Sequence, residues 1–223
     1  VESIGAYAFQ PCAKLETVNI AGTVQTIGDY AFGGCSKLQT VTIENGVKEL
    51  GSNMFFNCAS LKTAKMADSI ATIGEDCFYD CPNLTNVNIP QSLTTIPKRC
   101  FYNCKKLADI TIPMGVTTIK SAAFRNTGIK SLTIPDSVIS MDGSNFVGGV
   151  FEGCTQLQNI SIGKGLTQLP SSAFAGCTAL TSIAVPANIS NITGSFSGCT
   201  SLQQVQLSEG LETLGYGAFS RCT

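Results

Sequence analysis

The sequence contains no histidine and no tryptophan, and only 13% of its residues are charged. Histidine is the commonest general base and neutral metal ligand near pH 7, so its absence removes the usual centre of acid–base or metal chemistry. The 14 Lys and Arg residues are balanced by 15 Asp and Glu residues, which leaves no basic field to neutralise phosphates. No apolar run reaches the ~18 residues that a membrane-spanning helix requires. We therefore expect no nucleic-acid binding and no direct membrane insertion.

Catalytic motifs are missing as well. The sequence has no G-x-S-x-G, no Walker loop and no G-x-G-x-x-G, and its carboxylates are scattered without a convergent pair. A thiol protease would need a histidine to activate its cysteine, and the chain has none. The sequence predicts a protein that is not an enzyme and that uses no cofactor.

What the sequence does contain is a repeat of about 23 residues along the whole chain. Nine copies are complete and a tenth stops at Thr223, and they share the pattern V-x-x-I-G-x-x-A-F-x-x-C-x-x-L-x-x-V-x-I-P. The copies begin at Val1, Val24, Val47, Ile70, Leu93, Val116, Val138, Leu166, Ile189 and Leu211. One such unit cannot bury its own apolar face, so a repeat of this length indicates a solenoid in which neighbouring coils cover each other.

Each part of the repeat predicts a local structure. The L-x-x-V-x-I stretch predicts a strand, in which Val18 and Ile20 of the first copy point into the core while Thr17 and Asn19 face solvent. The V-x-x-I-G stretch returns across the coil. The A-F-x-x-C stretch is too short for a stable helix and predicts one tight or 3-10 turn.

Phenylalanine occupies one repeat position ten times. A side chain that recurs once per coil stacks on its equivalents along the solenoid axis, so we expect a continuous aromatic spine inside the coil. The members of this spine are Phe9, Phe32, Phe55, Phe78, Phe101, Phe124, Phe151, Phe174, Phe196 and Phe219.

The 23-residue unit with A-F-x-x-C-x-x-L-x-x-I-x-I-P closely resembles the BspA-like leucine-rich repeats of bacterial and protist surface proteins, and the resemblance covers the entire chain. It implies a secreted or surface-anchored module for adhesion or host interaction. Departures from the pattern are few. The sixth copy has Thr127 where cysteine is usual and is one residue short, and the seventh carries an insertion near residues 142–150.

The repeat and the resemblance together predict an α/β-type leucine-rich-repeat solenoid. We expect a curved right-handed coil with a parallel β-sheet on the concave face and short strands or 3-10 turns elsewhere. We expect residues 1–223 to form a single domain that is a piece of a longer protein, because the chain starts flush with a repeat and stops within one.

The eleven cysteines follow the repeat. Nine share one position, and the other two, Cys77 and Cys100, stand where other copies have alanine or methionine. Both positions are typical of small buried side chains, which predicts free thiols and no metal. Zinc is the alternative, because Cys77, Cys81, Cys100 and Cys104 lie on two adjacent coils, although their spacing differs from the usual C-x-x-C pairs. An occasional disulfide is the third interpretation.

Two surfaces are candidates for binding. The concave strand face is poor in charge and offers mostly hydroxyl and amide side chains, which suit a glycan or an extended peptide unless the face is simply solvated. Its candidate residues are Thr85, Asn86, Asn88, Asp109, Thr111, Lys130, Ser131 and Thr133.

The second surface is the edge that carries the A-F-x-x-C turn. There Phe56, Tyr79 and Tyr102 directly follow the spine phenylalanines of three consecutive copies, with Tyr7 and Tyr30 nearby. Aligned aromatics suit a folded protein partner, and the alternative is that they pack laterally on one another.

The insertion in the seventh copy adds Phe146 as a further candidate binding residue. Insertions in solenoids map to loops that often lie on the binding face. The alternative is that Phe146 and Val147 fold back as a plug over the bulge.

These observations predict a non-enzymatic binding or adhesion module on the cell surface or secreted, with an extracellular protein or a glycan as its partner. The alternative is a structural spacer that projects another domain from the cell surface.

Overall fold

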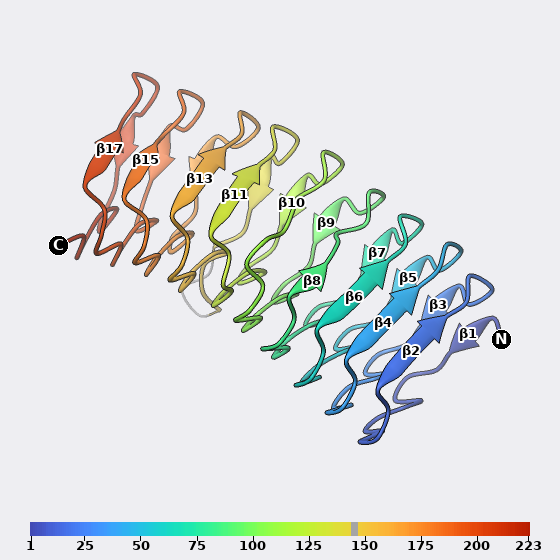
Figure 1. Cartoon of the computed structure of the whole chain (residues 1–223). Helices are drawn as coiled ribbons and strands as arrows, with labels where there is room; N and C mark the ends of the chain where they lie inside the picture. Colours follow the sequence, from blue (N-terminus) through green and yellow to red (C-terminus); the bar gives the residue numbers. More distant parts are fainter. Residues whose placement is uncertain (144–146) are drawn as a thin grey trace.

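The computed structural model describes residues 1–143 and 147–223, and it is an elongated stack of coils with the two chain termini at opposite ends (Figure 1). Each sequence repeat forms one coil, since the paired strands are one repeat apart, as in Thr17 opposite Thr40. We number the coils in chain order, so that coil five is residues 93–115, coil six 116–137 and coil seven 138–165.

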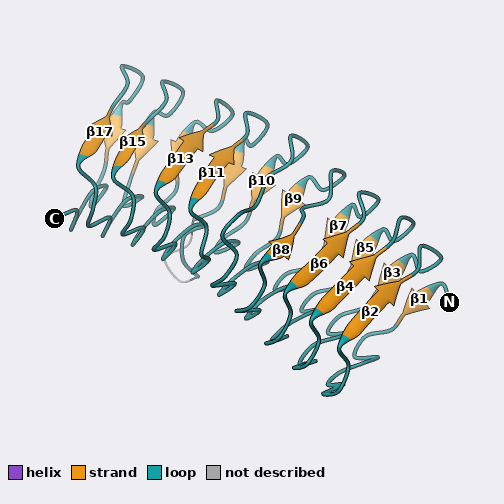
Figure 2. Cartoon of the chain, viewed as in Figure 1, coloured by secondary structure: helices purple, strands orange, loops and turns teal. Residues whose placement is uncertain are grey.

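Each coil contributes to one or both of two rows of parallel strands (Figure 2). The first row contains β2 (Thr17–Ile20), β4 (Thr40–Ile43), β6 (Thr63–Met66), β8 (Asn86–Val87), β11 (Ser131–Ile134), β13 (Asn159–Ile162), β15 (Ser182–Ala184) and β17 (Gln204–Gln206). The second row contains two-residue strands: β1 (Ser3–Ile4), β3 (Thr26–Ile27), β5 (Glu49–Leu50), β7 (Thr72–Ile73), β9 (Thr95–Ile96), β10 (Thr118–Ile119), β12 (Ser140–Met141), β14 (Gln168–Leu169), β16 (Asn191–Ile192) and β18 (Thr213–Leu214).

The predicted L-x-x-V-x-I strand is therefore confirmed in eight coils, whose strands form the first row. In β4 the residues alternate as expected, with Val41 and Ile43 buried and Thr40 exposed, whereas the three residues of β17 are all exposed. The outward side of this row is called the strand face below.

The strand rows are interrupted. The first row divides into the sheets β2-β4-β6-β8, β11-β13 and β15-β17, and the second into β1-β3-β5-β7, β9-β10-β12 and β14-β16-β18. The first interruption of the first row falls at coil five, which contributes β9 to the second row but no strand to the first (Figure 1).

The expectation of an α/β fold with 3-10 turns is wrong for the described residues, which contain strands, turns and irregular segments but no helix of either kind. The reason is visible around Phe55. Asn53 and Asn57 on either side of it both have φ 56°, the left-handed region, which ends a right-handed helical run after one turn. The N–H groups of Asn53, Phe55 and Asn57 instead donate to carbonyls of the next coil, each at 2.8 Å.

The predicted phenylalanine spine is confirmed. The rings of Phe32 through Phe196 are at most 1% exposed, and successive ring centroids lie between 4.9 and 5.7 Å apart along the row. The row is open at its two ends, where Phe9 is 39% exposed and Phe219 is partly buried. The spine therefore joins each coil to both of its neighbours.

Replacement of Phe78 by alanine should lower the free energy of unfolding by about 3–5 kcal/mol, because it leaves a cavity between two stacked rings. Urea denaturation followed by circular dichroism measures this loss. Tyr79→Ala is the matched control, since the neighbouring ring is only half-buried and its removal should cost clearly less. Equal losses in the two variants would contradict the role of the spine as the core.

Candidate binding surfaces

The edge of the solenoid carries a second row of rings, parallel to the spine. This aromatic row consists of Tyr7, Tyr30, Phe56, Tyr79 and Tyr102. The centroids of Phe56 and Tyr79 are 5.2 Å apart, and those of Tyr79 and Tyr102 are 4.7 Å apart with nearly parallel planes. The three predicted residues are thus brought together in register, and each is half-buried.

The faces of these rings already contact neighbouring side chains of the protein. Tyr79 is stacked between Phe56 and Tyr102, and the guanidinium of Arg125 lies 5.7 Å from the centroid of Tyr102. Lateral packing is therefore the interpretation that the geometry favours. What remains for a ligand at Tyr79 and Tyr102 is the ring edges and the hydroxyls.

An ion pair holds coils four and five together beside the aromatic row. Arg99 Nη2 lies 2.7 Å from Asp76 Oδ2, and Asp76 is only 6% exposed. Burial raises the pKa of Asp76 above its ordinary value, although the hydrogen bond and charge of Arg99 oppose the shift. Burial also raises the pKa of Tyr79, with a further contribution from Asp80, so its hydroxyl stays protonated and can donate a hydrogen bond.

On the strand face, every predicted residue is exposed: Thr85, Asn86, Asn88, Asp109, Thr111, Lys130, Ser131 and Thr133. Two hollows divide this set. The first, about 780 Å³, is lined by Asn86 and Asn88 together with Thr42 and Lys65. The second, about 850 Å³, is lined by Thr111, Ser131 and Thr133. The other three residues, Thr85, Asp109 and Lys130, line neither hollow.

Asn88 has a structural task that the sequence did not reveal. Its Nδ2 donates to the carbonyl of Met66, and its Oδ1 accepts a 2.9 Å hydrogen bond from the N–H of Met66. The side-chain amide thus bonds the main chain at the end of β6, and β8 stops at Val87. Asn88 is therefore a poor candidate for ligand binding, because both of its polar groups have partners.

Coil five interrupts the strand face beside the second hollow. In the part of the chain that the structure describes, no hydrogen bond involves the main-chain N–H or C=O groups of residues 109–112. Ile110, Thr111 and Ile112 also line the second hollow, and Met114 at its border is 70% exposed. Main-chain groups without a partner in the protein require water or a ligand. The interruption of the strand face was not predicted from the sequence. The signal for it is the presence of Asn88 and Asp109, two residue types that disfavour strands.

The cysteines form a row of hydrogen-bonded thiols. Cys58 Sγ donates to the carbonyl of Phe32 at 3.3 Å, Cys81 Sγ to that of Phe55 at 3.2 Å, and the same bond recurs along the stack. Burial raises the pKa of Cys58 to about 12 and that of Cys154 to about 11. All eleven cysteines are free of disulfides in this structure.

The zinc alternative finds no support in the geometry. Cys81 and Cys104 direct their thiols to the carbonyls of Phe55 and Phe78. No group of three or more His, Cys, Asp or Glu side chains within residues 1–143 and 147–223 is arranged to hold a metal ion. The absence of a metal in the protein remains a prediction, which the experiment below tests.

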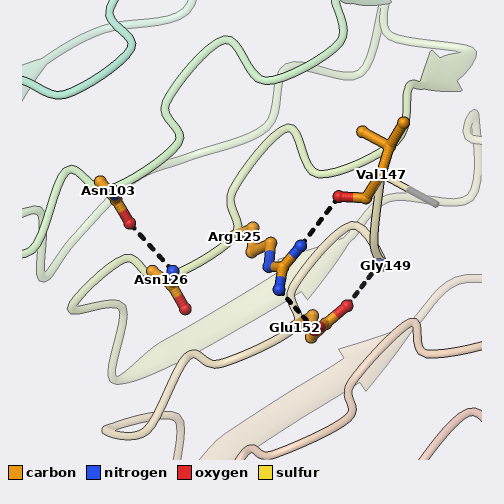
Figure 3. A network of polar contacts seen from close by, with 6 residues as sticks. All are labelled: Asn103, Arg125, Asn126, Val147, Gly149 and Glu152. Atoms are coloured by element: carbon orange, nitrogen blue, oxygen red, sulfur yellow. Dashed lines mark hydrogen bonds and ion pairs between the residues drawn. The ribbon is translucent and has the colours of Figure 1, made fainter. Parts of the chain in front are cut away.

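The insertion is tied to coil six on its C-terminal side (Figure 3). Arg125 Nη1 donates to the carbonyl of Val147 at 2.9 Å, and Arg125 Nη2 pairs with Glu152 Oε1 at 2.9 Å. Glu152 in turn accepts a hydrogen bond from the N–H of Gly149. The candidate Phe146 lies outside the described residues, so neither its role in binding nor the proposed plug is tested.

The described residues contain no helix long and apolar enough to cross a membrane.

Comparison with known proteins identifies the repeat. The sequence model of the BspA-type leucine-rich repeat region matches residues 2–125 and 123–223. No curated protein sequence matches the chain.

Several solved structures resemble this one. A leucine-rich repeat protein from Eubacterium ventriosum is 20% identical over 98% of this chain and 80% of its own, with a TM-score of 0.54, which shows the fold. A leucine-rich repeat protein from Bacteroides ovatus is 26% identical over 100% of this chain and 80% of its own, with a TM-score of 0.44. A leucine-rich cell surface protein from Faecalibacterium prausnitzii is 24% identical over 93% of this chain and 83% of its own, with a TM-score of 0.36.

Iodoacetamide at pH 8 should modify the folded protein rapidly only at Cys12 and Cys222, the two cysteines that are not buried. Since the raised pKa values keep the interior thiols protonated, they lack the reactive thiolate. Mass spectrometry counts the adducts, and the denatured protein should accept close to eleven. Rapid modification of interior thiols, several stable disulfides or stoichiometric zinc in elemental analysis would contradict this account.

Proposed function

The chain belongs to the BspA-type leucine-rich repeat family, and from that premise we propose that it is a non-enzymatic binding module, on the cell surface or secreted, that holds an extracellular partner on its strand face. The observation that carries the proposal is the interruption at coil five, where unpaired main-chain groups border the hollow lined by Thr111, Ser131 and Thr133. Family membership supports the extracellular location.

The chemistry of this hollow favours an extended polypeptide or a glycan as the partner. Its hydroxyl groups can each donate and accept a hydrogen bond, and Asp136 and Lys164 add one charge of each sign. Individual hydrogen bonds contribute only about 0.5–1.5 kcal/mol net, so affinity has to come from several of them acting together. An extended chain that crosses coils five to seven would meet this condition.

A folded protein partner would bind differently. The hydroxyls of Tyr79 and Tyr102 present a polar edge above a stacked apolar row, the combination that makes tyrosine frequent in protein interfaces. The aromatic row is therefore the second candidate surface of the same binding module.

The alternative function, a structural spacer, has one specific observation in its favour. The phenylalanine spine runs unbroken through the stack. It continues through coil five, which has no first-row strand, and across the boundary between coils seven and eight, where both strand rows are interrupted. Such an array can project another domain without binding anything itself.

Paired variants on the isolated chain distinguish these functions. Binding is first measured against immobilised extracellular-matrix proteins and a glycan array. For the partner found, Thr111→Lys with Thr133→Lys should weaken binding at least tenfold, because two long side chains would occupy the second hollow. Tyr79→Ser with Tyr102→Ser should leave it unchanged.

The reverse result would move the binding surface to the aromatic row. Undiminished binding by both double variants would contradict both placements, and a chain that binds nothing in either panel would favour the spacer. Asn88→Ala does not serve as a test variant, because it removes the hydrogen bonds to Met66 as well as any ligand contact.

A further inference from the structure

Coil six differs from its neighbours at the turn after the aromatic row. Between the core positions Cys104 and Leu107, coil five has Lys105 and Lys106, and coil seven has Thr155 and Gln156 at the equivalent place. Coil six has only Gly128 between Thr127 and Ile129. The missing residue coincides with a hollow of about 590 Å³, whose side walls include Lys105, Thr155 and Gln156. This hollow is called the coil-six recess.

Two glycines keep the recess open. A Cβ atom on Gly128 would lie 2.4 Å from the carbonyl oxygen of Lys105, and one on Gly153 would lie 2.1 Å from Oδ1 of Asn126. Contacts this short are not tolerated, and the first is with main chain that cannot move aside freely. At Gly128 the recess is therefore fixed by the close approach of the main chain of coil five, and at Gly153 by the side chain of Asn126.

One wall of the recess is a row of oriented amides. Asn126 Nδ2 donates to Asn103 Oδ1 at 2.9 Å (Figure 3), and Asn103 Nδ2 donates to Asp80 Oδ1 at 2.7 Å. All three residues are in the left-handed region, with φ between 54° and 59°, which asparagine and aspartate tolerate best among non-glycine residues. The amides are held in place before any ligand arrives, which lowers the entropy cost of binding.

The amide row ends with unused hydrogen-bonding capacity. Within the described residues, Oδ1 of Asn126 accepts no hydrogen bond, and the N–H groups of Gly128 and Ile129 donate none. In coils five and seven, by contrast, the N–H groups of Leu107 and Leu157 at the position of Ile129 donate to the carbonyls of Cys104 and Cys154. The shortened turn thus leaves polar groups beside the recess without the partners that a regular coil supplies.

The recess also has a charge preference. Arg125 is occupied by Glu152 and by the carbonyl of Val147, and neither charged residue lines the recess (Figure 3). Lys105 is the lining residue that carries a charge; it is exposed and forms no ion pair with the described part of the chain. Asp80, which accepts the hydrogen bond of Asn103, does not line the recess, and no other carboxylate within the described residues lines it. The combination favours a ligand that has hydroxyl groups and a negative charge.

From this arrangement we propose that the coil-six recess is a binding site for the uronate residue of an acidic glycan, separate from the strand face. Sugar hydroxyls donate to Oδ1 of Asn126 and accept from the amide of Gln156, and the uronate carboxylate pairs with Lys105. The volume of about 590 Å³ lies within the ~300–1,000 Å³ range of small-molecule sites.

The test is a titration of the whole chain with hyaluronan tetrasaccharide, which alternates uronate and N-acetylhexosamine, followed by two-dimensional NMR of the amide groups. Chitotetraose serves as the uncharged control ligand. The acidic sugar should shift the signals of Gly128, Gly153 and the Asn126 side chain, and it should bind at least fivefold more tightly than chitotetraose. Shifts confined to the strand face, no shifts, or equal affinity for the two sugars would overturn the proposal.

Three variants separate this site from general charge attraction. Gln156→Glu keeps the shape of an exposed side chain but adds a carboxylate to the wall, so it should weaken hyaluronan binding at least fivefold and leave chitotetraose binding unchanged. Lys105→Ala should weaken hyaluronan binding to a similar degree. Lys106→Ala is the matched control, because it removes the neighbouring charge, which does not line the recess, and should leave affinity unchanged. Equal losses for Lys105→Ala and Lys106→Ala, or no effect of Gln156→Glu, would overturn the proposal.

Discussion

The stacking of each coil on the next is the interaction on which the rest of this structure depends. A single repeat has an apolar side that it cannot cover by itself. The neighbouring coils cover it, each with a phenylalanine ring at the same repeat position. The separation of the spine rings, for example 5.3 Å between Phe55 and Phe78, is close to the ~4.8 Å spacing of paired strands. One spacing therefore satisfies the main-chain hydrogen bonds and the packing of the core together.

That spacing turns every repeat position into a row. Rings contact rings in the aromatic row, and amides bond amides at Asn103 and Asn126. From Cys35 on, the thiols of the recurring cysteine position donate to a phenylalanine carbonyl of the preceding coil. The rows stabilise the solenoid, but they also use up the surfaces and polar groups that a ligand would need. Capacity for binding consequently remains where a row is interrupted, as at residues 109–112 and at Gly128, rather than where the repeat is most regular.

Sequence periodicity predicted the features that depend on one coil resembling the next. The strand positions, the buried cysteines and the spine from Phe32 to Phe196 follow directly from residue types that recur at a fixed spacing. The sequence indicated that the A-F-x-x-C stretch is too short for a stable helix, but the α/β class and the 3-10 turns were wrong. The tight turn depends on left-handed residues such as Asn53 and Asn57, whose conformation is a property of their contacts with the next coil. The role of Asn88 was missed for a similar reason, since its amide competes with main-chain pairing to a residue one repeat away.

One candidate site was predicted from the repeat pattern and the other was not. The sequence placed Thr111, Ser131 and Thr133 on one face, and the structure places them around one hollow. The sequence also showed that coil six lacks a residue and has Thr127 in place of cysteine. The repeat pattern by itself does not show that these departures form a recess. The recess appears only when the neighbouring turns of coils five and seven are seen on either side of Gly128.

Coil six also shows why a solenoid can accept such a departure. Thr127 replaces the thiol's bond to the preceding coil with a bond inside its own coil. Its hydroxyl donates to the carbonyl of Phe124 at 2.9 Å, which also accepts from Cys154 Sγ, and it lies 3.1 Å from that sulfur. The rings of Phe101, Phe124 and Phe151 remain stacked through the shortened coil at 5.3 to 5.4 Å. Because each coil contacts only its neighbours, the cost of a missing residue is confined to two interfaces, and the intact spine offsets it. A repeat protein can therefore change one exposed turn, and with it the chemistry of one site, while the rest of the stack is unaffected.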